Sequence, residues 1–218
     1  MFHQRTRDLY FAALRPANKL NYWRWMLQGW HKNGIAETHL HLGCGLKYLP
    51  GFVNLEGNVF RKSDMWLDLR NGLPFRSDSV TSIYASHVFE HFYPDELQRL
   101  LRECYRILWP GGGLRVVVPD MSGAVRAYLE GEREYFTDFP RPLRSLGGKL
   151  SNLLFCEGGH RQAFDFSYMD EVLRDAGFAE VWPSSPAGSR VYPPEVLSRL
   201  QQEEAGVAPF SLFVECRK

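Results

Sequence analysis

The chain has 218 residues, of which 44% are hydrophobic and 23% are charged, and its formal net charge at neutral pH is +1. This length and composition predict one globular domain with an appendage, and the balanced charge gives no reason to expect a nucleic acid as a partner. No run approaches the roughly 18 apolar residues of a membrane span and no signal peptide is recognisable, so we expect a cytoplasmic protein.

The N-terminal segment has apolar residues at helical intervals from Leu9 to Trp30, and Pro16 predicts a break into two helical pieces. Basic residues lie among its tryptophans and tyrosines. We interpret the segment, residues 1–37, as a helical appendage that packs against the domain and covers its ligand cleft. The alternative is a basic, aromatic helix that makes peripheral contact with a membrane surface or binds a partner.

The pattern then changes to short apolar runs, predicted as four strands: His39–Leu42, Phe52–Leu55, Met65–Leu69 and Val80–Ala85. Strand one ends at Gly43 and Gly45, where glycine permits a sharp turn and the close approach of a ligand. Strand two is followed by Glu56, whose carboxylate can accept hydrogen bonds from ribose hydroxyls. Together these residues predict a nucleoside-binding edge of a parallel sheet.

A helix is predicted from Pro94 to about Leu108, because apolar residues follow one face of it. The run Pro110–Gly113 should stop this helix before a central strand, Leu114–Val118. Further along, Ser167 and Asp170 have the spacing of a capping box that opens another helix.

Two last strands are predicted at Phe178–Trp182 and Ser211–Cys216. Between Asp120 and Phe164 the sequence is irregular and rich in aromatic residues and glycines. Insertions of this kind usually hold substrate contacts, so we expect a lid or substrate insertion at about 121–163 within a domain of residues 38–218.

The four cysteines, Cys44, Cys104, Cys156 and Cys216, are widely separated, and no two form a C-x-x-C pair. This spacing favours reduced thiols over a disulfide framework or a zinc site. We therefore expect no metal site.

Five segments occur along this pattern in a recognisable order: His41–Gly45, Asp68–Phe75, Ser86–His91, Glu103–Asp120 and Ala176–Phe178. The series resembles the class I S-adenosylmethionine-dependent methyltransferases, specifically the small bacterial predicted methyltransferases of the type 11-like branch. The resemblance covers about Thr38 to Val181. Its most specific parts are the Glu-His pair after strand four and the Arg-x-Leu-x-Pro-Gly-Gly turn.

The resemblance implies a doubly wound, Rossmann-like α/β sheet of seven strands, mostly parallel, with the antiparallel last strand inserted beside strand five. It also implies an S-adenosylmethionine site formed by Gly43, Cys44, Gly45, Glu56, Asp68, Leu69, Ser86 and His87. In that site Glu56 would bind the ribose diol, Asp68 would reach the adenine amino group, and His87 would face the sulfonium.

Two departures from the family pattern are visible. Only Gly43 to Gly51 separates strands one and two, whereas a helical crossover needs about a dozen residues, so the first helix should be shortened or missing. This disfavours an NAD-dependent enzyme, whose pyrophosphate binds at that helix. Lys47 replaces the usual third glycine, which leaves open a non-catalytic relative that binds the cofactor or serves as a scaffold.

Methyl transfer is an in-line displacement that requires an aligned acceptor, and an oxygen or nitrogen acceptor must also lose a proton. Histidine is suited to that task near neutral pH, and the candidates are His87, His91 and His160. His91 could instead make a capping or packing contact. Asp120, after strand five, either contacts substrate, as His160 would, or caps the next helix. We predict O- or N-methyl transfer to a small-molecule, sugar or lipid-linked acceptor.

Overall fold

A seven-stranded sheet forms the centre of the molecule, in a computed structural model that describes residues 4–28 and 38–218. The strands are β1 (His39–Leu42), β2 (Val53–Glu56), β3 (Met65–Trp66), β4 (Val80–Ser86), β5 (Leu108–Pro119), β6 (Glu180–Pro183) and β7 (Ser211–Arg217). Their order is β3-β2-β1-β4-β5-β7-β6. The first five strands run parallel, and β7 is antiparallel to both β5 and β6. The predicted doubly wound sheet is therefore confirmed.

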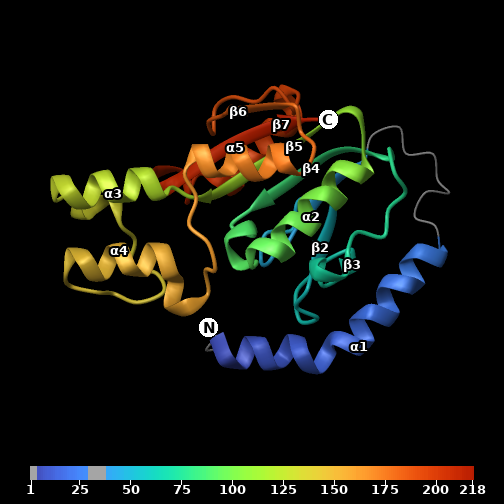
Figure 1. Cartoon of the computed structure of the whole chain (residues 1–218), viewed down its shortest axis with the longest axis horizontal. Coiled ribbons are helices and arrows are strands. Elements are labelled where there is room, and N and C mark those ends of the chain that lie inside the picture. The colour runs from blue at the N-terminus through green and yellow to red at the C-terminus, as the bar shows by residue number, and fades with distance from the viewer. Residues whose placement is uncertain (1–3, 29–37) are drawn as a thin grey trace.

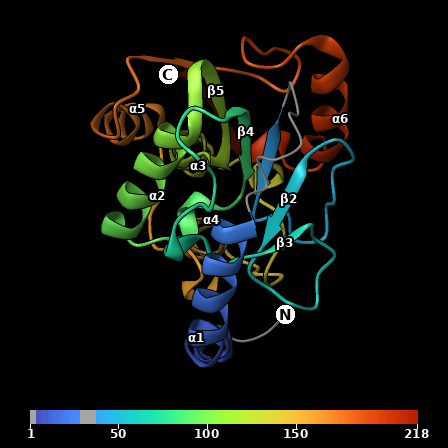
Figure 2. The ribbon, with the colours of Figure 1, turned by 90° about the vertical axis from the view of Figure 1, so that its right-hand side faces the viewer.

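Helices lie on both faces of this sheet (Figures 1 and 2). They are α1 (Gln4–Gln28), α2 (Pro94–Ile107), α3 (Met121–Glu130), α4 (Leu146–Phe155), α5 (Phe166–Asp175) and α6 (Pro194–Glu204). Short 3-10 turns are η2 (Leu69–Asn71), η3 (Phe89–His91), η4 (Arg133–Tyr135), η5 (Cys156–Gly158) and η6 (Ala208–Phe210). None of these described helices is long and apolar enough to cross a membrane.

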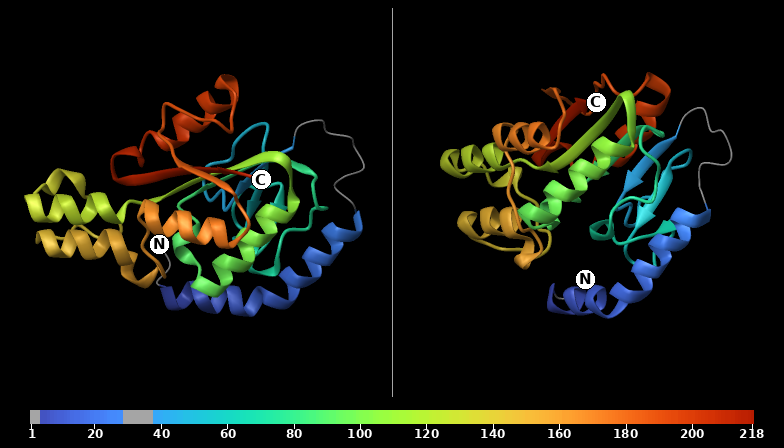
Figure 3. Two further views of the ribbon diagram at one scale, coloured as in Figure 1. Left: turned by 45° about the horizontal axis from the view of Figure 1, so that its top comes forward. Right: turned by 45° about the vertical axis from the view of Figure 1, so that its right-hand side comes forward.

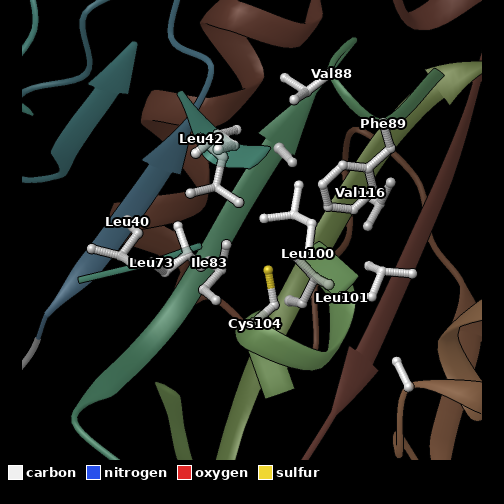
Figure 4. Close-up of a cluster of buried hydrophobic side chains, with 14 of the residues drawn as sticks. Leu40, Leu42, Leu73, Ile83, Val88, Phe89, Leu100, Leu101, Cys104 and Val116 are labelled. Carbon is white, nitrogen blue, oxygen red and sulfur yellow. The ribbon is translucent and has the colours of Figure 1, made fainter. Parts of the chain in front are cut away.

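The main core lies between the sheet and α2 (Figure 4). Side chains alternate across a strand, so Ile83 of β4 and Val116 of β5 face this core. The helix meets them with buried residues at helical intervals: Leu97, Leu100, Leu101 and Cys104. The intervening strand residues face the other side, where Tyr84 and Val117 pack against α6. The strands are thus fixed by packing on both faces.

The N-terminal helix α1 is continuous, so the predicted break into two pieces is wrong. Pro16 lies inside the helix, and Figure 3 shows a bent rather than an interrupted ribbon. A proline removes one helical hydrogen bond and bends the helix without necessarily ending it. Trp30, which was assigned to the same helical pattern, lies outside the described residues.

Strand β5 begins at Leu108, so Pro110–Gly113 does not separate helix from strand as predicted. The glycines join the sheet because Gly111 N donates to Lys218 O and Lys218 N donates to Gly112 O, both at 3.0 Å. The pairing of β4 with β5 shifts register here, which accommodates the extra residues. The strand assigned to Met65–Leu69 is shorter than predicted, because the chain turns into η2 at Leu69.

Residues 121–163 are less irregular than predicted, because they include α3 and α4, which pack side by side. Ala124 and Ala127 of α3 are buried against Leu153 of α4. The predicted capping box is also wrong: α5 is capped by Asp165, whose carboxylate accepts a hydrogen bond from Tyr168 N at 2.9 Å. Helix α6 was not predicted. Between β1 and β2 only turns occur, so the expected loss of the first helix is confirmed.

Candidate active site

The turn after β1 has the backbone conformation that only glycine adopts readily. Gly43 and Gly45 have φ values of +61° and +56°. A Cβ on Gly43 would lie 2.7 Å from Val88 Cγ2, so Val88 excludes any side chain there. Among the described residues, only Gly43 O comes within 4 Å of a Cβ position on Gly45, at 3.9 Å. The outer side of this turn is therefore open to a ligand.

Glu56, at the end of β2, is fixed by two main-chain donors. Its Oε2 accepts a hydrogen bond from Gly45 N, and its Oε1 accepts one from Asn58 N, both at 2.8 Å. Each oxygen of a carboxylate can accept more than one hydrogen bond. Glu56 thus joins the glycine turn to β2 and keeps acceptor capacity for further hydroxyl groups.

Asp68 is bound within the protein. Its Oδ2 pairs with Arg70 Nη2 at 2.7 Å, and its Oδ1 accepts from Arg70 N at 3.1 Å. Its own N–H donates to Asn18 Oδ1 of α1 at 2.7 Å. Leu69 is buried in the main core. The carboxylate of Asp68 therefore orders the turn η2 in this structure, and its contact with adenine stays a prediction.

Helix α1 lies across the ends of β2 and β3 (Figures 2 and 3). The hydroxyl of Tyr10 accepts a hydrogen bond from Val59 N at 2.8 Å, and Phe11 lies against Gly57. Farther along, Asn21 Nδ2 donates to Trp66 O. These contacts hold α1 against β3 and the residues that follow β2, as expected for a helix that packs over the nucleoside-binding edge.

The three candidate histidines surround one buried carboxylate, that of Glu90, which is 1% exposed. Strand β4 ends at Ser86, and η3 then carries Glu90 and His91. His87 Nδ1 lies 3.3 Å and His160 Nε2 3.9 Å from Glu90 Oε1. Residues separated by about seventy positions in the sequence thus meet at the carboxyl end of β4.

Main-chain carbonyl groups orient two of these imidazoles. His91 Nδ1 bonds to Gly159 O at 2.9 Å, and His160 Nδ1 bonds to Leu154 O at 3.2 Å. A carbonyl oxygen can only accept, so each Nδ1 carries the hydrogen. The main chain also links the two segments, because Arg161 N donates to Glu90 O at 2.7 Å.

Burial and charge act in opposite directions on this cluster. Burial alone would raise the pKa of Glu90, but His87, His91 and His160 outweigh it and lower the pKa to about 2. Burial lowers the pKa of His160 to about 4, although the Glu90 carboxylate opposes the change. Glu90 is therefore ionised and His160 neutral near pH 7.

Residues 40–116 match a family model described as a methyltransferase domain. They carry the glycine turn, Glu56 and the Glu-His pair on a sheet of the expected strand order. Over this stretch the chain is therefore similar to methyltransferase domains. No curated protein matches the chain.

Several solved structures are similar in fold to this chain. An S-adenosylmethionine-dependent methyltransferase from Archaeoglobus fulgidus is 13% identical, with 97% of this chain and 94% of that chain covered and a TM-score of 0.48. A possible histamine N-methyltransferase from Thermotoga maritima is 17% identical, with 96% and 97% covered and a TM-score of 0.49. Phosphoethanolamine N-methyltransferase 2 from Haemonchus contortus is 11% identical, with 89% and 52% covered and a TM-score of 0.45.

The residues at the ends of β1 and β2 fit S-adenosylmethionine, the cofactor that the resemblance implies. The turn at Gly45 leaves space beside the backbone, and Glu56 retains acceptor capacity suited to a ribose diol. Lys47, which replaces the third glycine, is held against α6 by Glu203, with 3.1 Å between Lys47 Nζ and Glu203 Oε1. The replacement therefore leaves the open side of Gly45 unfilled.

The remaining candidate residues lie at the ends of β1, β4 and β5. Cys44 is buried, and burial raises the pKa of its thiol to about 12, so it is no nucleophile. Asp120 occupies the N-cap position of α3, but its side chain makes no capping hydrogen bond. Ser86 is half-buried at the end of β4. Sequence reasoning missed Glu90 as the centre of the histidine cluster, although the Glu-His pair contained it.

Proposed function

We propose that this enzyme transfers the methyl group of S-adenosylmethionine to an oxygen or nitrogen atom of a small-molecule, sugar or lipid-linked acceptor bound beside the histidine cluster. The observation that supports this proposal best is the contact between Gly43 and Val88. Val88 lies between His87 and Glu90 in sequence, and its side chain packs on the glycine turn at a distance that excludes a Cβ there. The cofactor edge and the histidine cluster are therefore neighbours.

The protein's own part in this reaction begins with binding. The turn at Gly43 and Gly45 supports the methionine part of the cofactor, and Glu56 accepts hydrogen bonds from the ribose hydroxyls. Bound S-adenosylmethionine supplies a methyl group activated by a positively charged sulfur. The transfer also requires an acceptor atom that is held close to this methyl group and in line with its bond to sulfur.

The histidine cluster removes the acceptor's proton in this proposal. The hydrogen bond from His160 Nδ1 to Leu154 O leaves the lone pair of the neutral ring on Nε2. Nε2 faces the Glu90 carboxylate at 3.9 Å, and a nearby carboxylate stabilises an imidazolium once it forms. His160 is therefore the first candidate for the base, with His87 and His91 beside it.

The helices α3 and α4 supply acceptor contacts in this proposal. Their segment carries exposed aromatic side chains, among them Tyr128, Phe139 and Phe155, which are 42%, 58% and 59% exposed. Aromatic rings offer apolar faces suited to small molecules, sugars and lipid-linked groups. Asp120, at the start of α3, is proposed as a polar acceptor contact.

The test compares His160→Ala with the wild-type enzyme and with His39→Ala, a histidine at the opposite end of β1. Calorimetry with S-adenosylhomocysteine should give similar affinities for all three proteins. Conversion of S-adenosylmethionine to S-adenosylhomocysteine with a small-molecule extract as acceptor source should fall about 10²-fold or more only in His160→Ala. A wild-type protein that binds the cofactor without converting it would favour the scaffold alternative.

A further inference from the structure

The negative charge of the buried Glu90 carboxylate requires a neighbouring group to stabilise it. Its side chain is 1% exposed, and neither carboxylate oxygen has a hydrogen-bond partner among the described residues. A buried carboxylate without hydrogen bonds is strongly unfavourable unless a positive charge lies beside it. The structure therefore indicates that a cation belongs at this position.

The neighbouring histidines have the orientation found in metal sites. Glu90, His91 and His160 each offer one ligand atom, and these atoms all lie within 4.8 Å of one another. Both histidines direct Nδ1 to a main-chain carbonyl, on Gly159 and Leu154 respectively. Metal-binding histidines usually make such a hydrogen bond with one nitrogen, which fixes the ring and places the lone pair on the other.

His87 also contacts the Glu90 carboxylate. Ser211 Oγ donates its hydrogen to Val207 O at 2.7 Å, so it can only accept from His87 Nε2, which lies 3.0 Å away. In a neutral ring, His87 Nδ1 then carries a lone pair and faces Glu90 Oε1 at 3.3 Å. Two such atoms repel each other at this distance unless a proton or a metal ion lies near both.

We propose that Glu90, His91 and His160 bind one divalent transition-metal ion, through the carboxylate and the Nε2 atoms of the two imidazoles. Two imidazoles and a carboxylate suit Zn²⁺, Fe²⁺, Co²⁺ or Mn²⁺ better than Ca²⁺ or Mg²⁺. Ligand atoms around such an ion lie roughly 3 to 3.5 Å apart when each bond is about 2.1 Å long. The side chains must therefore draw together slightly when the ion binds.

The position of the ion suggests a role in binding the acceptor. This role rests on the proposed methyl transfer. The ion lies beside Val88, which packs on the cofactor turn at Gly43. Three protein ligands leave coordination positions open, as catalytic metal sites require. An acceptor with a hydroxyl or phenolic oxygen would bind there, so the ion would position this oxygen and make its proton more acidic. His91 and His160 then act as metal ligands, so the acceptor's proton passes to His87, the remaining histidine of the cluster.

The test uses full-length protein without a polyhistidine tag, stripped with a chelator and dialysed. Titration with Co²⁺ should give visible absorption bands that saturate near one equivalent, and Zn²⁺ should displace the Co²⁺ and raise the melting temperature. Glu90→Gln, His91→Ala and His160→Ala should each weaken binding about tenfold or more, while His39→Ala should bind like the wild type. Circular dichroism checks the fold of each variant. The titration of the wild type tests the metal site even if a variant fails to fold.

Two results would overturn the metal site: no uptake of either ion by the wild type, or equal uptake by the wild type and all folded ligand variants. If the wild type still converts S-adenosylmethionine to S-adenosylhomocysteine in that case, the proposed methyl transfer stands without the metal, and a proton supplies the positive charge beside Glu90. If S-adenosylhomocysteine does not bind, the proposed function fails independently of the metal.

Discussion

Buried charged side chains have different kinds of partner in two regions of the sheet. Beside β5 and β7, Arg115 is fully buried and pairs with Glu204 and Glu215, with nitrogen–oxygen distances of 2.8 Å. Its guanidinium also donates to main-chain oxygens, such as Ser185 O at 2.8 Å. At the carboxyl ends of β1, β2 and β4, by contrast, Glu56 is held only by main-chain N–H groups and Glu90 has no hydrogen-bond partner among the described residues.

The difference separates structural charges from functional ones. A buried ion pair is tolerated when nearly all of its donors and acceptors are satisfied inside the protein, as they are around Arg115. A carboxylate that keeps unused acceptor capacity can instead bind a ligand, as proposed for Glu56 and Glu90. Substitutions beside β5 and β7 should therefore change stability, whereas substitutions at the carboxyl edge should change binding.

The largest effect is expected for Arg115→Met. The substitution leaves Glu204 and Glu215 buried without their partner, so the free energy of unfolding should fall by about 3 to 5 kcal/mol. Urea denaturation followed by circular dichroism measures this loss. The folded fraction should bind S-adenosylhomocysteine with unchanged affinity, because Arg115 lies away from the carboxyl edge.

Arg99→Met is the matched control for this prediction. Arg99 also pairs with a carboxylate, Asp95, but the two side chains are 63% and 69% exposed. Exposed pairs contribute less than about 1 kcal/mol, so this variant should unfold almost like the wild type. Equal effects of the two substitutions would show that burial does not distinguish the ion pairs.

Glu56→Ala should change binding more than stability. The ribose diol would lose a charged acceptor, so the affinity for S-adenosylhomocysteine should weaken by about 2 kcal/mol, or roughly 30-fold. Calorimetry measures the affinity directly. Asp68→Asn is a useful comparison, because Arg70 already binds that carboxylate. A large loss in Asp68→Asn with none in Glu56→Ala would place the ribose elsewhere.

Local sequence patterns were sufficient for most of the sheet. Strands β1 and β4 and helix α2 have strong apolar periodicity, and these elements agree with prediction within one or two residues. Helices α3 and α4 were missed because small residues, such as Gly123 and Ala124, form part of the buried face of α3. A hydrophobicity pattern gives such residues little weight, and glycines suggest loops.

Other features depend on contacts between distant parts of the chain. The early start of β5 depends on main-chain hydrogen bonds between its glycines and Lys218, at the C-terminus. The sequence identified His87, His91 and His160 individually, but their arrangement around Glu90 requires the loop after α4 to meet η3. No local pattern contains that information. The predictable part of the site is therefore its residue types, and the unpredictable part is their geometry.

The smallest effect concerns α1, which borders the carboxyl edge. Tyr10→Phe removes the hydroxyl that accepts from Val59 N, so the free energy of unfolding should fall by about 1 kcal/mol. Leu27→Ser is the matched change on the outer side of the same helix, where Leu27 is 84% exposed, and it should leave stability unchanged. Sedimentation with anionic vesicles should leave the wild type and both variants in solution if α1 serves only to cover the domain. Vesicle binding by the wild type that is weakened in Leu27→Ser would instead support a membrane contact, because only the outer face would then carry the interaction.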